Sequence, residues 1–310
     1  MKVRNYARHL TEFLAIYVAL VLVAPLPRRL ILWLSRGLAR LAFVFSRRDK
    51  RIALANVDFV YGTSLSKEAK LAIVQKAFET FGLVLLDLFW FRFCTRQRIT
   101  RWVQFDASLD DYFRGGTWII VTAHFGNWEV MGLAAALRGH GSASVAAPLD
   151  NPLLERVLTK WRRATGQEVV GRQGAVRELL KKLKNGQSVA LLVDQNTLPN
   201  EGGIFVDFLG MPATMSPAAE MLARRTGRPV LPCFCAPDLK GGYRVFALPA
   251  IPPPGEATPK GAVTRQIAAA IERVVRADPG LWLWMYKRWK YFRTDMESER
   301  FPFYARLWKD

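Results

Sequence analysis

Short apolar segments alternate with helix-forming segments along most of this 310-residue chain, and this alternation limits the folds open to it. Segments typical of buried strands lie at 117–123, 143–148, 167–170, 188–193, 229–235 and 243–248. Helices are predicted at 127–138, 151–164, 174–184, 217–226 and 261–277. Strands that are separated by helices form a parallel sheet. The sequence therefore predicts an α/β fold, with a mostly parallel central sheet flanked by helices on both faces.

The composition indicates a folded and strongly basic protein. Hydrophobic residues make up 51% of the chain, which is enough for a full core and argues against disorder. The formal net charge of +19 implies an acidic partner, which is nucleic acid, an anionic membrane surface, or an acidic protein or lipid. The ten tryptophans favour the membrane, because tryptophan is enriched at the membrane–water boundary.

The N-terminal residues have the pattern of a membrane-binding segment. Residues 13–26 are almost purely apolar, and as a helix they cover roughly 20 Å, less than the ~30 Å hydrocarbon core of a bilayer. A second apolar run, Leu30 to Phe45, carries Arg36 and Arg40 on one helical face, as a helix lying in the interface does. We predict a membrane anchor at 1–45, formed by a short hydrophobic helix and a basic amphipathic helix. A hydrophobic hairpin packed on the protein's own core is the alternative.

Two further segments are rich in apolar or aromatic residues. Residues 202–214 are edged by glycine, and an exposed apolar loop there would suit an acyl chain, with a β-hairpin packed on the core as the alternative. The segment Trp282 to Lys290 interleaves aromatic and basic residues. Proteins that stack nucleobases do this, as do proteins at the lipid headgroup layer. The apolar N-terminus favours the membrane over nucleic acid.

His124 follows the predicted strand 117–123, and Gly126-Asn127 predicts a turn into the next helix. The carboxyl end of a strand in an open α/β sheet is where such sheets bind ligands. Histidine can take a proton near neutral pH, and Glu129 is close enough in sequence to fix its tautomer and stabilise the imidazolium. We predict His124 as a general base with Glu129 as its partner. A structural histidine at a strand end is the alternative.

Other polar residues are predicted to lie near His124. Asp194 follows the strand 188–193, where it could hold an arginine or orient a substrate hydroxyl, unless it caps its own turn. Arg162 on a helix and Arg172 after 167–170 suit phosphate groups, because a guanidinium donates two parallel hydrogen bonds. Each arginine could equally be a surface residue. With only three histidines in the chain, a catalytic zinc, which usually needs three protein ligands, is not expected.

These motifs follow the order of a known family. The chain resembles the bacterial lipid A biosynthesis acyltransferases, the late lauroyl- and myristoyl-transferases, whose motif is His-x4-Asp/Glu, here His124 to Glu129. The agreement extends to the apolar N-terminus, Asn151-Pro152, Arg162-x3-Gly166, 171–174, 193–195, 208–213, Trp282-Leu283-Trp284 and Arg288-Trp289-Lys290. Gly126-Asn127-Trp128 departs from the well-studied lipid A enzymes and resembles mycobacterial mannoside acyltransferases. The resemblance therefore leaves the acceptor open.

The resemblance implies direct transfer of a fatty acyl chain from acyl carrier protein, or from acyl-CoA, to a hydroxyl of a membrane glycolipid such as a lipid A precursor. It implies His124 as general base and Glu129 as its partner, with Asp194 and an arginine near position 162 lining the site. Together with the residues considered above, the predicted substrate-binding set is Arg162, Arg172, Asp194 and Gln195. It implies no metal, and no cofactor besides the acyl donor.

The domains implied are the anchor at 1–45 and an acyltransferase catalytic domain at 46–310. The partners expected are acyl carrier protein, the glycolipid acceptor and the anionic surface of the bacterial inner membrane, with the active site on its cytoplasmic face and without nucleic acid. Two other functions are considered. One is a lipid esterase or thioesterase that uses the same pair on water, and the other is a non-catalytic basic membrane-binding protein.

Overall fold

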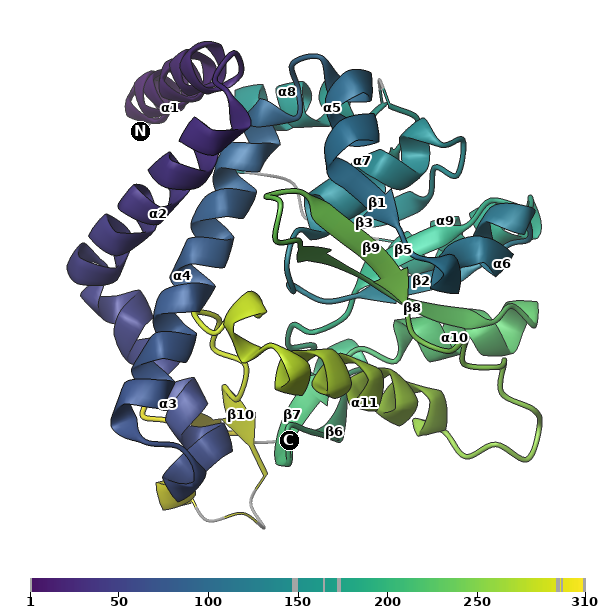
Figure 1. Ribbon diagram of the computed structural model, residues 1–310. Helices are drawn as coiled ribbons and strands as arrows, with labels where there is room; N and C mark the ends of the chain where they lie inside the picture. The colour runs from purple at the N-terminus through teal and green to yellow at the C-terminus, as the bar shows by residue number, and fades with distance from the viewer. Residues whose placement is uncertain are drawn as a thin grey trace.

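The computed structural model describes residues 2–146, 150–163, 165–171, 174–293, 296 and 298–308. Within these residues a seven-stranded sheet has the order β1-β9-β8-β2-β5-β3-β4 (Figure 1). Its parallel strands are β2 (Ile119–Thr122), β3 (Ala143–Ala146), β4 (Glu168–Gly171), β5 (Val189–Leu192) and β8 (Val230–Pro237). The strand β9 (Tyr243–Ala247) pairs antiparallel with β8, and β1 (Val103–Phe105) pairs parallel with β9. The mostly parallel sheet predicted from the sequence is confirmed.

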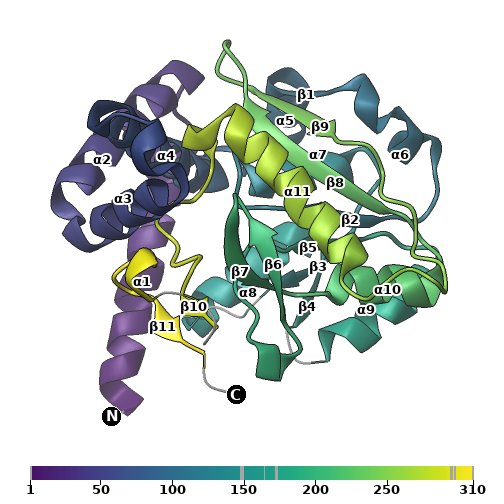
Figure 2. The same cartoon turned by 90° about the horizontal axis from the view of Figure 1, so that it is seen from below.

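Helices cover both faces of this sheet. One face carries α9 (Ala175–Lys184), α10 (Ala218–Thr226) and α11 (Ala262–Ala277), and Figure 2 shows α11 lying across β8. The opposite face carries α7 (Trp128–Leu137), and α8 (Pro152–Arg163) packs against β4. All four residues of β2 are buried, as expected for a central parallel strand covered on both faces. The shorter helical elements are α5 (Thr95–Trp102), α6 (Asp110–Arg114) and 3-10 turns at Gly62–Ser64, Ala107–Leu109, Pro199–Glu201, Pro279–Leu281 and Ser298–Arg300.

The glycine-edged segment forms a β-hairpin. Strands β6 (Ile204–Phe208) and β7 (Met211–Met215) pair antiparallel around a turn in which Leu209 and Gly210 both have positive φ, 57° and 79°. Phe208 and Leu209 are buried, and β6 packs against α11. The prediction of an exposed loop was therefore wrong, and the alternative of a hairpin on the core is confirmed.

The C-terminal aromatic segment is also part of the core. Trp282, Trp284, Trp289 and Arg288 are at most 2% exposed, and the tryptophan rings contact one another. The interpretation of this segment as a membrane-facing surface was wrong, because its aromatic rings pack under the hairpin and against Phe208. Beyond it, β10 (Tyr291–Phe292) pairs with β11 (Arg306–Leu307).

The N-terminal residues form a layer of helices beside the sheet, comprising α1 (Lys2–Val23), α2 (Arg28–Phe45), α3 (Arg47–Tyr61) and α4 (Lys67–Trp90). Figure 1 shows α4 between α2 and the sheet. The helix α2 packs on α4 through a stripe of buried side chains at Ile31, Ser35, Ala39 and Phe43. A Cβ at Gly82 of α4 would lie 3.3 Å from the Ser35 carbonyl oxygen, so the two helices approach closely there.

The predicted membrane anchor is not supported by this arrangement. Among the described residues, no helix is both long and apolar enough to cross a bilayer. The helix α1 has 22 residues, but its first half is polar, and α2 carries arginines along its length. The alternative, in which these helices pack on the protein's own core, holds for α2. Its other face still exposes large apolar side chains, including Trp33 and Phe45.

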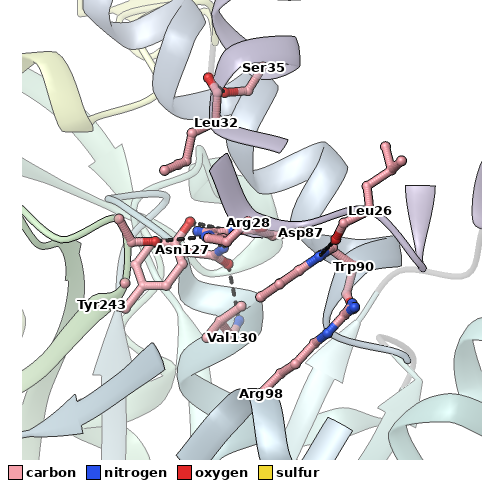
Figure 3. A network of polar contacts seen from close by, with 12 residues as sticks. Leu26, Arg28, Leu32, Ser35, Asp87, Trp90, Arg98, Asn127, Val130 and Tyr243 are labelled. Carbon is pink, nitrogen blue, oxygen red and sulfur yellow. Dashed lines mark hydrogen bonds and ion pairs between the residues drawn. The ribbon is translucent and has the colours of Figure 1, made fainter. Parts of the chain in front are cut away.

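A buried polar network joins α2 to the sheet and to α7 (Figure 3). Arg28, at the first position of α2, forms an ion pair with Asp87 of α4, and both residues are at most 4% exposed. Asp87 also accepts hydrogen bonds from the Tyr243 hydroxyl and from Asn127 Nδ2, the latter at 3.3 Å. The Asn127 side chain then accepts from the backbone N–H of Val130 at 3.0 Å, which caps α7. The network therefore ties the start of α2 to the start of α7.

Replacing Asp87 with alanine should destabilise the protein by about 3–5 kcal/mol, because Arg28 would be left buried without its anion. The matched control is Asp58→Ala, which removes the ion pair with Lys70 on the surface, where Asp58 is 69% exposed. That change should cost no more than about 1 kcal/mol. Urea unfolding of the three proteins measures both losses, and similar losses in the two variants would contradict the role of the buried pair.

Candidate active site

His124 and Asp194 are brought together by the register of two neighbouring strands. In the parallel pairing of β2 with β5, the last residues of the two strands, Thr122 and Leu192, lie opposite each other. His124 and Asp194 each follow two positions after the end of their strand. His124 Nδ1 is 2.8 Å from Asp194 Oδ1, and the His124 backbone N–H donates to Oδ2 at 2.9 Å. The indole N–H of Trp282 donates to the same Oδ2 at 2.9 Å. Asp194 is therefore fixed by three hydrogen bonds at the carboxyl edge of the sheet.

This geometry sets the protonation of the imidazole. A carboxylate only accepts hydrogen bonds, so Nδ1 of His124 carries a hydrogen and donates it in a hydrogen bond to Asp194, which leaves a lone pair on Nε2 of the neutral ring. Burial lowers the pKa of His124, but the charge and hydrogen bond of Asp194, with a smaller effect of Glu129, outweigh it and raise the pKa overall. Burial raises the pKa of Asp194, but its hydrogen-bonding partners, led by His124, lower it overall. The pair therefore combines an ionised carboxylate with a ring that is more basic than usual.

Glu129 has a different partner from the one the sequence predicts. Arg162 of α8 donates through Nη2 to both carboxylate oxygens of Glu129, at 3.0 and 3.4 Å. The prediction that Glu129 fixes the tautomer of His124 was therefore wrong, because Asp194 forms that hydrogen bond. Glu129 lies in the first turn of α7 and faces α8, although its charge still raises the pKa of His124.

The turn between His124 and α7 depends on Gly126 and Asn127. Gly126 has a φ of +58°, and a Cβ there would lie 1.9 Å from the Cys235 carbonyl oxygen. The N–H of Asn127 donates to that same carbonyl at 2.9 Å. The helix begins at Trp128, whose ring centroid is 4.8 Å from that of His124. The predicted turn into a helix is confirmed.

The remaining predicted residues lie in different environments. Gln195 is exposed, and its Nε2 is 3.5 Å from His124 Nε2. Arg162 contacts Glu129, as described above. Arg172 lies outside the described residues, so its position relative to His124 is not part of this structure. Within the described ranges, no group of three His, Cys, Asp or Glu side chains could hold a metal ion.

Two residues at the site were not predicted from the sequence. Trp282 binds Asp194 through its indole N–H. Asn196 holds the loop after β5, because its Nδ2 donates to the Lys287 carbonyl at 2.9 Å and its Oδ1 accepts from Arg288 at 2.9 Å. Polar residues directly after an apolar strand were the signal for Asn196. No local pattern indicated Trp282, because its contact joins segments that are distant in sequence.

Comparison with known proteins identifies the family of this chain. The family model described as bacterial lipid A biosynthesis acyltransferase matches residues 1–291. The chain is 26% identical over 276 residues to the lipid A biosynthesis lauroyltransferase of Escherichia coli (strain K12), covering 87% of this chain and 88% of that protein. It is 27% identical over 177 residues to a phosphatidylinositol mannoside acyltransferase of Mycobacterium tuberculosis, covering 55% and 54%.

A lipid A biosynthesis acyltransferase of Haemophilus influenzae is 20% identical over 247 residues, covering 78% of each chain. These relatives are all named acyltransferases, and the family match covers the strands, the hairpin and the aromatic segment that build the site. The chain is therefore an acyltransferase, and it belongs to the bacterial lipid A biosynthesis acyltransferase family.

Proposed function

We propose that this enzyme transfers a fatty acyl chain from a thioester to a hydroxyl of a membrane glycolipid, with His124 as the general base. The observation that carries this proposal is the ring held by Asp194 at Nδ1, with Nε2 left as the base. The acceptor hydroxyl gives its proton to Nε2 as its oxygen attacks the thioester carbonyl carbon. The carbon–sulfur bond then breaks, and the departing thiolate takes the proton from the imidazolium. Asp194 stabilises the ring while it is charged.

The substrates follow from the relatives and from the charge of the chain. The relatives are named for lipid A and for phosphatidylinositol mannoside, so a glycolipid acceptor fits both, and the match over most of the chain to the lauroyltransferase favours a lipid A precursor. The net charge of +19 favours an acidic donor, which suits acyl carrier protein and also the phosphates of acyl-CoA. These donors would place the active site on the cytoplasmic face of the bacterial inner membrane.

Replacing His124 with alanine should lower kcat/KM for acyl transfer by about 10²–10⁴-fold, because the acceptor hydroxyl would lose its base. The rate is measured with a radiolabelled thioester and glycolipid acceptors. The control is His140→Ala, which removes a ring that packs against Tyr112 and Phe113. Equal rates in the two variants would contradict the assignment. Release of free fatty acid instead of acylated lipid by the wild type would favour a thioesterase.

Replacing Asp194 with asparagine should change both the rate and its pH dependence. The neutral ring is the active form, so kcat/KM falls as the pH drops through the pKa of His124, which lies above its ordinary value of 6.5. The variant lacks the carboxylate that raises this pKa, so the fall should move to lower pH. The plateau should drop by up to about 10⁴-fold, since an amide can hold the wrong tautomer. A pH–rate profile that keeps its midpoint would contradict the role of Asp194.

We infer that the exposed face of α2 contacts an anionic membrane surface. Trp33 and Phe45 are 67% and 76% exposed, and Arg36 and Arg40 are exposed on the same helix. Apolar side chains beside basic ones are typical of helices that lie in the interface, where each basic residue contributes about 1 kcal/mol near anionic lipid. This placement needs no membrane-spanning helix.

The double variant Trp33→Ser, Phe45→Ser should bind phosphatidylglycerol-containing vesicles at least about tenfold more weakly, because two large apolar side chains are lost from the contact. Leu239→Ser is the matched control, since Leu239 is a fully exposed apolar side chain in the turn between β8 and β9. Co-sedimentation with vesicles measures the binding. Unchanged binding of the double variant, or an equal loss in the control, would exclude α2 as the contact.

A further inference from the structure

Arg92 carries a charge that the fold does not neutralise directly. It lies just after the end of α4, and its Nε is buried without a hydrogen-bond partner in the part of the chain that the structure describes. Across the same residues its guanidinium makes no ion pair, and it lies over the ring of Trp161, 5.4 Å from the ring centroid. Arg92 as a whole is half-buried, but its Nε is a buried donor, and a buried donor without an acceptor is costly. Arg92 therefore has a donor available for an anion or another acceptor.

The neighbours of Arg92 belong to the active site. Trp161 precedes Arg162 on α8, and Arg162 is paired with Glu129. Burial lowers the pKa of Arg92, while the charge of Glu129 raises it and the charge of Arg162 lowers it, so these groups are close enough to interact. Two cations therefore share one carboxylate, Glu129, whose charge also acts on His124, and this leaves the three groups with a net positive charge.

The geometry of Arg162 leaves donors for a second anion. Both of its hydrogen bonds to Glu129 come from Nη2, at 3.0 and 3.4 Å. Its Nε and Nη1 make no hydrogen bond to any described residue. Glu129 therefore orients the guanidinium of Arg162 and occupies only part of its donor set. A tetrahedral oxyanion suits the remaining donors, because guanidinium groups form parallel hydrogen bonds to phosphate.

We propose that Arg92 and Arg162 form a binding site for a phosphate ester carried by one of the two substrates. This inference rests on the proposed acyl transfer, because it assigns the site to a substrate of that reaction. The location favours the headgroup of the acceptor lipid. Arg92 directly follows α4, which belongs to the N-terminal helical layer. In that layer α1 and α2 expose large apolar side chains.

The first test measures binding without any chemistry. The full-length protein is titrated with decyl phosphate, and the Kd is compared among the wild type, Arg92→Gln and Arg101→Gln. Arg101 is the matched control, because its guanidinium lies over the ring of Trp102 at the same 5.4 Å but away from Glu129. We expect Arg92→Gln to weaken binding by about 10–100-fold, the range for a charge-assisted hydrogen bond, and Arg101→Gln to bind as the wild type does. Decanol serves as the uncharged probe and should bind all three proteins equally.

The second test identifies the source of the phosphate. KM values for the acceptor and for the thioester donor are measured separately in Arg92→Gln, and the acceptor is also supplied without its phosphate. A rise of about 10–100-fold in the acceptor KM alone, absent with the dephosphorylated acceptor, assigns the site to the lipid headgroup. A rise in the donor KM alone assigns it to the phosphate of the donor. Unchanged KM values for both substrates overturn the proposal.

Two further results keep this inference separate from the proposed function. Arg92→Lys retains a charge without the planar fork, so a smaller loss than in Arg92→Gln supports the site even if Arg92→Gln folds poorly. Wild-type affinity for decyl phosphate in Arg92→Gln overturns the site whatever the rate of acyl transfer. Full activity of His124→Ala would remove the proposed base, yet the decyl phosphate titration would still decide whether the anion site exists.

Discussion

The hydrogen bond between His124 and Asp194 depends on the parallel pairing of β2 with β5. These strands are adjacent in the sheet but distant in sequence, because β3 and β4 and the helices after them intervene. A slip of one residue would turn each side chain to the opposite face of the sheet and separate the imidazole from its carboxylate. The packing of both sheet faces fixes the register, so the core that buries β2 also maintains the hydrogen bond that sets the tautomer of His124.

The buried ion pair of Arg28 and Asp87 has a comparable role on the other side of His124. Asp87 contacts Asn127, and Asn127 caps the helix that carries Glu129. Arg28 is the first residue of α2, whose outer face is apolar and exposed. The amphipathic helix α2 and the turn that follows His124 thus share one polar network. This network fixes the start of α2 relative to the start of α7.

Periodicity and the His-x4-Glu motif predicted the sheet, the helices on both faces and the position of His124. Local sequence could not show which carboxylate reaches the ring, because that depends on the pairing of non-consecutive strands. Glu129 was the nearer acid in sequence, whereas Asp194 is the one in contact. The prediction that the aromatic segment at Trp282 faces a membrane was wrong for a related reason. Alternating aromatic and basic residues suit a membrane surface, and only tertiary packing shows that these tryptophans fill the core.

The residues between His124 and Glu129 bear on the question of the acceptor. Gly126 is required by the approach of the Cys235 carbonyl, and Asn127 is required by the cap of α7 and by Asp87. Both residues therefore have a structural role in this chain. The ring of Trp128, by contrast, lies 4.8 Å from the imidazole of His124. Of these three residues, Trp128 is the one whose side chain contacts the candidate site, so an effect of Gly126-Asn127-Trp128 on the choice of acceptor is best sought at Trp128.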